Sequence, residues 1–295
     1  MFRCSLALAL ACAAAFAATA NASQLIDRNA RDVTLSVNAK GEALITYRDG
    51  GTLRRVLAWG AVNAIAPTKA RKQVAFKLDY SGGWSTYRTH YWETFHGSCG
   101  AYDGPQLAWK VVACKAPDGS YWALQAWQRG LPNYGVAPNA FQSSWELRLS
   151  HWTGDTAVLD IQTDWAWHRW DHLFGTFTYD GSPVYGFKAS SAGVPLDTFG
   201  RNVYVDTFDS AYGRGWKREN SFLTHSGDGV FCYSFNPHGS HPAGKGSEYR
   251  ATVEGPGVTP DVMWQGTSPG SYNATADALA NQAIRSLGDR QCRAN

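Results

Sequence analysis

From residue 23 onward the chain alternates hydrophobic and polar positions in short runs that end at Gly, Pro, Asn or Asp. A period of two is typical of strands, whose successive side chains face opposite sides of a sheet. Residues 33–37, 43–47 and 52–58 follow one another in this way and predict a meander. Residues 109–114 with 121–128, and 174–179 with 182–187, predict two hairpins joined by turns that contain Asp-Gly.

A fourth hairpin is predicted for residues 144–152 and 156–164. If Leu147 lies opposite Ile161 and Leu149 opposite Leu159, the apolar side chains share one face of the sheet. The other face is then polar and carries Glu146, Arg148, Asp160, Gln162 and Asp164.

Only the end of the chain has helical spacing. Apolar residues recur every three or four positions from Ala276 to Leu287, with Asn273 or Thr275 as the N-cap and Gly288 as the end. The sequence therefore predicts an all-β, mainly antiparallel fold, a β-sandwich or jelly roll with one C-terminal helix at about 274–288. No linker or internal repeat interrupts residues 23–295, which predicts a single β-rich domain.

Composition narrows the class of protein. Only 17% of the 295 residues are charged while 14% are aromatic, which argues against a coiled coil or helical bundle. The net charge of +3 comes from interspersed side chains, so we do not expect a nucleic acid partner.

Residues 1–22 have the pattern of a secretory signal peptide. They combine Arg3, an apolar run over residues 6–18 and the small residues Ala20-Asn21-Ala22 before the predicted cleavage site. We therefore expect a secreted bacterial protein, extracellular or periplasmic, with no stable membrane insertion after cleavage, and a monomer.

Four cysteines remain beyond the predicted leader: Cys99, Cys114, Cys232 and Cys292. An even number in an exported chain indicates two disulfides, for which three pairings exist. We favour Cys99 with Cys114, which closes a local loop, and Cys232 with Cys292, which ties the C-terminal tail to the body. A four-cysteine zinc site is the alternative, but no pair has the C-x2-C spacing that such sites usually have.

The segment Trp165 to His172 holds the densest group of aromatic and titratable residues. In a helix, His168 and His172 would share a face and could bind zinc together with His238 or His241. In an extended segment they would lie about 13 Å apart. The tryptophans favour an extended or irregular segment, so we expect no metal or other cofactor and assign a substrate-binding role to Trp165, Trp167, His168 and Trp170.

Aromatic rings beside polar groups are the usual means of binding sugars. Tyr204, Tyr212 and Arg218 lie in such segments and complete the predicted substrate-binding set. Glycoside hydrolysis needs two carboxyl groups, and a lyase needs a base such as His or Tyr with Arg or Asn against a uronate. The predicted catalytic residues are Asp164, Asp171, Asp206, Glu219 and His225.

Motifs of other enzyme classes fail on physical grounds. The stretch Gly266 to Gly270 has the outline of a hydrolase nucleophile elbow, but Pro269 has no N–H for an oxyanion hole and no histidine follows.

The first hypothesis is a protein that binds or degrades polysaccharide, as a glycoside hydrolase or polysaccharide lyase. The second is a non-catalytic extracellular or envelope protein, structural or with an unknown ligand.

Overall fold

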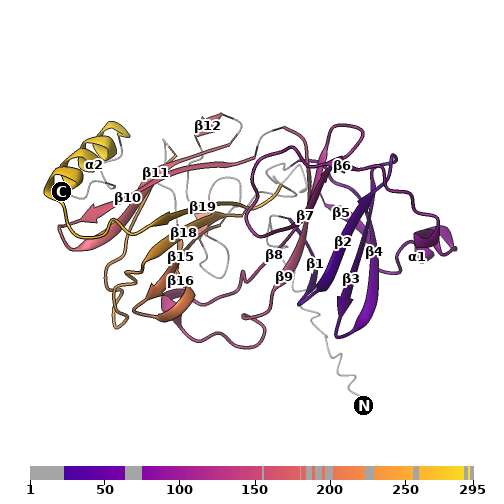
Figure 1. Ribbon diagram of the computed structural model, residues 1–295, viewed down its shortest axis with the longest axis horizontal. Coiled ribbons are helices and arrows are strands. Elements are labelled where there is room, and N and C mark those ends of the chain that lie inside the picture. The colour runs from indigo at the N-terminus through magenta and orange to yellow at the C-terminus, as the bar shows by residue number, and fades with distance from the viewer. Residues whose placement is uncertain are drawn as a thin grey trace, which may run out of the picture.

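The computed structural model describes residues 23–63, 75–154, 156–179, 181–183, 188–189, 195–196, 202–222, 229–254, 259–288 and 292. Within these residues the fold is mainly antiparallel β-sheet with one long helix near the C-terminus, which confirms the predicted fold class. The strands form two sandwiches that lie side by side, with the earlier strands in one and the later strands in the other (Figure 1).

The first sandwich is built from residues before 153. One sheet has the order β1 (Gln24–Arg28), β9 (Glu146–Trp152), β8 (Tyr121–Trp127), β7 (Lys110–Lys115) and β6 (Gly100–Ala101). The other has the order β2 (Arg31–Val37), β3 (Glu42–Asp49), β4 (Thr52–Gly60) and β5 (Phe76–Asp79). Ile45 and Val56 of the second sheet pack against Trp122 and Leu149 of the first in one buried core. In the described part of the chain, short helical segments that connect strands are α1 (Trp84–Tyr87), η1 (Tyr91–Glu93) and η2 (Asn133–Gly135).

The second sandwich follows the same principle. Its first sheet contains β10 (Val158–Ala166), β11 (Trp170–Tyr179) and β12 (Ser182–Pro183), with β17 (Val230–Ser234) also paired to β11. Its second sheet has the order β16 (Gly213–Phe222), β15 (Val203–Ser210), β18 (Glu248–Val253) and β19 (Val262–Thr267). Leu173 and Phe231 of the first sheet pack on Val205 and Ala251 of the second. A separate two-stranded ribbon consists of β13 (Lys188–Ala189) and β14 (Pro195–Leu196).

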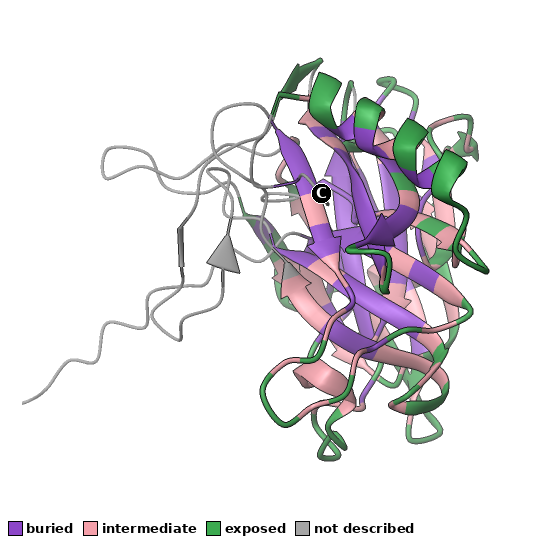
Figure 2. Ribbon diagram, turned by 90° about the vertical axis from the view of Figure 1, so that its left-hand side faces the viewer, coloured by how far each residue is buried: buried purple, intermediate pink, exposed green. Residues whose placement is uncertain are grey.

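Helix α2 (Ala274–Ser286) covers the outer face of the β10–β11 sheet. Asn273 caps it as predicted, since its side chain accepts hydrogen bonds from the N–H groups of Thr275 and Ala276. Ile284 is fully buried and packs with Phe174 and Val230. The opposite side of the helix is exposed, as Figure 2 shows from that end of the molecule.

Both preferred disulfides are present, Cys99–Cys114 and Cys232–Cys292. They are compatible with a protein outside the cytoplasm. Among the described residues, no helix is long and apolar enough to cross a membrane.

Local strand predictions were confirmed but the fourth hairpin was wrong. The meander pairs as β2–β3–β4, and Lys115 opposite Tyr121 closes the hairpin of β7 and β8. Tyr179 opposite Ser182 begins the other predicted hairpin, while residues 184–187 of its second arm lie outside the described residues. In contrast, β9 pairs with β8 and β1, while β10 pairs with β11. The chain leaves the first sandwich after β9, so β9 and β10 belong to different sandwiches. The alternating apolar residues of each strand therefore pack in a different core, beside different partner strands.

A buried polar contact joins the sandwiches. Arg129, just after β8, is only 6% exposed and donates from Nε to Oε1 of Glu254 at 2.6 Å. Its Nη1 lies 3.7 Å from Oδ2 of Asp261, which also accepts a hydrogen bond from Trp127. Glu254 and Asp261 belong to the second sandwich, so charge pairing holds the two cores together. The expectation of a single domain stays a prediction.

Candidate functional site

The predicted site residues fall into separate groups in the structure. The first, Tyr204, Asp206 and Arg218, lies in the interior close to the junction of the sandwiches. Arg218 is 1% exposed, donates from Nε to Oδ1 of Asp206 at 2.6 Å and lies 4.0 Å from the ring centroid of Tyr204. A guanidinium that is buried and already paired is poorly placed to neutralise a substrate carboxylate.

Asp171 belongs to a second interior group. It faces the core from β11, is fully buried, and accepts hydrogen bonds from the hydroxyls of Tyr249 and Ser268. The ammonium of Lys245 lies 3.3 Å from its other oxygen and 4.2 Å from the Trp165 ring centroid. These contacts place Asp171 in a network that ties β11 to the loops around β18 and β19.

The aromatic segment forms the turn between β10 and β11. Trp167 and His168 occupy the turn with φ of 49° and 56° and are exposed, so the segment is an extended hairpin as expected. His168 contacts the hydroxyl of Tyr272 and lies 3.7 Å from Asp277 of α2. Trp170 is half-buried under the guanidinium of Arg169.

Asp164 is buried at the same corner. Burial raises its pKa to about 6, and a hydrogen bond with the Asp277 carboxyl acts in the same direction. His172 lies opposite Asp164 on β11, and full burial lowers its pKa to about 4. Among the described residues, no three His, Cys, Asp or Glu side chains are grouped so that they could hold a metal ion.

The remaining predicted residues, Tyr212 and Glu219, lie in a cluster that holds three residues not predicted from the sequence. We call Tyr134, Tyr212, Glu219, Tyr233 and His238 the tyrosine–histidine cluster. The Tyr233 hydroxyl donates to Oε1 of Glu219 at 2.9 Å and lies 2.6 Å from Nε2 of His238. Glu219 is fully buried, while the His238 side chain is 22% exposed. The hydrogen bonds therefore run from a buried carboxyl through a phenol to an imidazole that solvent reaches.

Two side chains of the tyrosine–histidine cluster, Glu219 and His238, have shifted pKa values. Burial raises the pKa of Glu219 to about 7, although the hydroxyls of Tyr233 and Tyr212 oppose that shift. Burial lowers the pKa of His238, and the neighbouring His241 lowers it further. Glu219 therefore changes charge near pH 7, and burial favours the neutral form of the His238 imidazole beside it. A perturbed carboxyl next to an imidazole is a property of acid–base centres.

Four parts of the chain build the cluster. Glu219 is on β16, Tyr233 is on β17, and His238 follows β17 in a turn closed by backbone hydrogen bonds with His241. Tyr134 comes from η2, between β8 and β9, and stacks on the His238 ring at a centroid distance of 4.7 Å. The cluster thus lies where a loop of the first sandwich meets the second.

The η2 loop fits closely against the cluster. Gly135 has φ +62°, and a Cβ there would lie 2.3 Å from Cβ of Tyr212. Asn133 donates to the side chain of Asn220 at 3.1 Å. Tyr134 itself has a left-handed backbone, with φ 58° and ψ 34°, a conformation unfavourable for a bulky residue.

The sequence indicates only some of the residues in this cluster. The sequence predicts Tyr212 as a substrate-binding residue by its type alone, and it offers His238 only as a possible metal ligand. Nothing local connects Tyr134 or Tyr233 to them, because they lie in distant segments. His225, the fifth predicted catalytic residue, lies outside the described residues.

No family model, curated protein or solved structure matches this chain.

Proposed function

We propose that the protein degrades an extracellular polysaccharide that contains uronic acid, by β-elimination at the tyrosine–histidine cluster. The observation that carries the proposal is the hydrogen-bonded series Glu219, Tyr233, His238, which ends at a partly exposed imidazole. The abundance of aromatic residues and the two disulfides support a role on glycans outside the cytoplasm.

His238 is the base in this proposal. Because the Tyr233 hydroxyl donates to Glu219, its oxygen can accept a hydrogen bond from Nε2–H of His238. That tautomer leaves a lone pair on Nδ1, and the lowered pKa keeps the imidazole neutral at pH 7. Ionised Glu219 accepts the Tyr233 hydroxyl, and its Oε1 lies 3.3 Å from Nε2 of His238, so it stabilises the imidazolium that forms when His238 takes a proton.

The reaction balances without a co-reactant. Nδ1 of His238 takes the proton from C5 of the uronate, the electron pair forms a C4=C5 double bond, and the C4–O bond breaks. The departing oxygen needs a proton, which the hydroxyl of the half-buried Tyr212 supplies once it turns from the Pro242 carbonyl, to which it donates at 3.0 Å. Arg214, exposed on β16 two residues beyond Tyr212, is the candidate to neutralise the uronate carboxylate.

Elimination fits this cluster better than hydrolysis does. Glycosidases place two carboxyl groups about 5 to 9.5 Å apart across the scissile bond. Within the described part of the chain, the side chains that contact Glu219 are phenols and an imidazole, and none of them is a carboxyl. Phenol and imidazole are the groups that proton abstraction from a sugar ring requires.

The second candidate is a non-catalytic structural protein. It is favoured by the full burial of Trp122 and Trp152, which shows that several of the aromatic residues serve the cores. It predicts that the protein alters no polysaccharide.

Product analysis separates these outcomes. The protein, with both disulfides formed, is incubated with uronic and neutral polysaccharides, and soluble products are identified by mass spectrometry. We expect fragments with an unsaturated end, lost in His238→Gln and Tyr212→Phe but retained in the controls His90→Gln and Tyr80→Phe, both exposed residues of the first sandwich. Fragments that have gained water would show that the protein is a hydrolase and not a lyase. No fragments from any polymer would favour the structural protein.

A further inference from the structure

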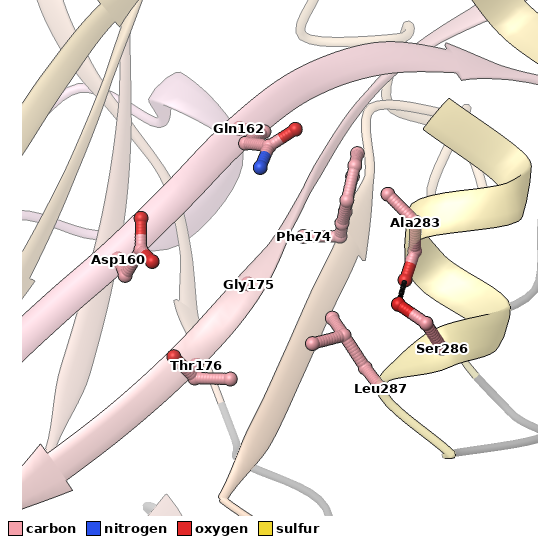
Figure 3. Close-up of a pocket in the computed structure, with 8 residues that line it drawn as sticks. All are labelled: Asp160, Gln162, Phe174, Gly175, Thr176, Ala283, Ser286 and Leu287. Carbon is pink, nitrogen blue, oxygen red and sulfur yellow. Dashed lines mark hydrogen bonds between the residues drawn. The ribbon is translucent and has the colours of Figure 1, made fainter. Parts of the chain in front are cut away.

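A pocket of about 150 Å³ lies between α2 and the outer face of the sheet beneath it. Strand β10 and strand β11 form one wall and the last turns of α2 the other (Figure 3). The lining residues are Asp160, Gln162, Phe174, Gly175, Thr176, Ala283, Ser286 and Leu287.

The pocket combines an apolar floor with unpaired polar groups. Ala283 and Leu287, both partly exposed, provide the apolar surface, and Phe174, 1% exposed, closes the pocket beneath them. Among the described residues, no hydrogen bond engages the side chains of Asp160, Gln162 or Thr176, although all three line the pocket (Figure 3). A ring with an apolar face and hydroxyls at its edge would satisfy both kinds of surface.

The two walls are held in place before any ligand binds. A Cβ at Gly175 would lie 1.8 Å from the Asp160 carbonyl oxygen, so the strands approach closely only because this residue is glycine. Ile284 anchors the helix in the core beneath it, and the disulfide Cys232–Cys292 holds the chain just beyond the helix. A pocket that is already formed loses little entropy on binding.

We propose that this pocket is a carbohydrate subsite that takes one uncharged pyranose ring. Its volume is about half of the ~300 Å³ at which pockets for larger small molecules begin, which suits a single ring. The carboxylate of Asp160 accepts hydrogen bonds from sugar hydroxyls and repels a uronate. Gln162 and Thr176 add donors and acceptors beside the ring.

This subsite goes beyond the proposed elimination, because binding here needs no proton transfer. It is built from β10, β11 and α2, and it shares no residue with the tyrosine–histidine cluster. The two proposals can therefore fail separately.

The test is calorimetric titration of the oxidised protein with neutral trisaccharides of glucose, xylose and mannose, and with a trisaccharide of uronic acid. Ala283→Leu fills the pocket, and Ala278→Leu places the same side chain on an exposed position of the same helix. Gln162→Ala removes a polar group without filling the space. Thermal unfolding of each variant shows whether the fold is retained.

We expect at least one neutral trisaccharide to bind to the wild-type protein and to the Ala278→Leu variant. Ala283→Leu should weaken that binding by roughly tenfold or more, and Gln162→Ala by less. Absence of binding by all neutral trisaccharides, or equal binding by Ala283→Leu and Ala278→Leu, would overturn the proposal. Polysaccharide cleavage by the same Ala283→Leu sample reports on the tyrosine–histidine cluster. Loss or retention of cleavage therefore tests the proposed elimination separately from the subsite.

Discussion

Glu219 shows how strongly burial changes the chemistry of one side chain. Its pKa is raised to about 7 from the ordinary 4.5 of a glutamate side chain, because the folded protein removes the carboxylate from water. The folded state therefore binds a proton that the unfolded state has already lost between these two pH values. The stability this contributes is present below pH 4.5 and is lost as the pH rises through about 7.

We expect Glu219→Gln to make the unfolding free energy depend less on pH between about 4.5 and 8. For wild type, the shift corresponds to a loss of about 3 kcal/mol in unfolding free energy between pH 4.5 and pH 8, as an order of magnitude. Denaturant unfolding at pH 5 and pH 8 measures the difference, with the exposed Glu93→Gln as the control. An unchanged difference in Glu219→Gln would show that the buried carboxyl is not the cause.

At the scale of elements, the docking of η2 onto β16 builds the candidate site. Gly135 and Gly119 both have positive φ, +62° and +85°, but only Gly135 lies against another residue, Tyr212. Alanine at either position carries the backbone strain, about 1 kcal/mol. Only Gly135→Ala also forces Tyr212 to move.

We therefore expect Gly135→Ala to lower the unfolding free energy by an additional 1 to 3 kcal/mol, approximately, over Gly119→Ala. Denaturant unfolding of the two variants at one pH gives the comparison. Equal destabilisation would mean that η2 is not packed against Tyr212 as described.

The pairing of the strands also shows which features of the fold and the site can be predicted from the sequence. Turn residues between neighbouring runs predicted the meander and two hairpins, because the information is local. The pairing of residues 144–152 with 156–164 failed because the alternation of apolar residues limits register but does not choose the partner strand. For the same reason the sequence suggested Tyr212 and Glu219 but not Tyr134 and Tyr233, which only the tertiary fold brings to them.

At the scale of the whole molecule, two cores are joined through buried charges. Arg129 pairs with Glu254 and Asp261, and its side chain is 5% exposed. Removal of Arg129 takes the guanidinium away from two buried carboxyl groups in a region of low dielectric.

We expect Arg129→Met to lower the unfolding free energy by about 3 to 5 kcal/mol. The exposed pair of Arg48 with Asp32 supplies the control, since Arg48→Met should cost less than about 1 kcal/mol. Denaturant unfolding followed by tryptophan fluorescence measures both. A small effect for both variants would contradict the role of this charge cluster in joining the sandwiches.

The proposed elimination requires Glu219, Tyr233 and His238 to act together as an acid–base centre. The most direct test is the pH dependence of the initial rate of polyuronate cleavage, measured for the wild-type protein and Glu219→Gln. We expect the wild-type rate to rise as the pH passes through about 7, where Glu219 ionises. Glu219→Gln should be slower and lack this rise, keeping only the rise at lower pH at which His238 loses its proton. A Glu219→Gln variant that keeps the wild-type rate and profile would contradict the claim.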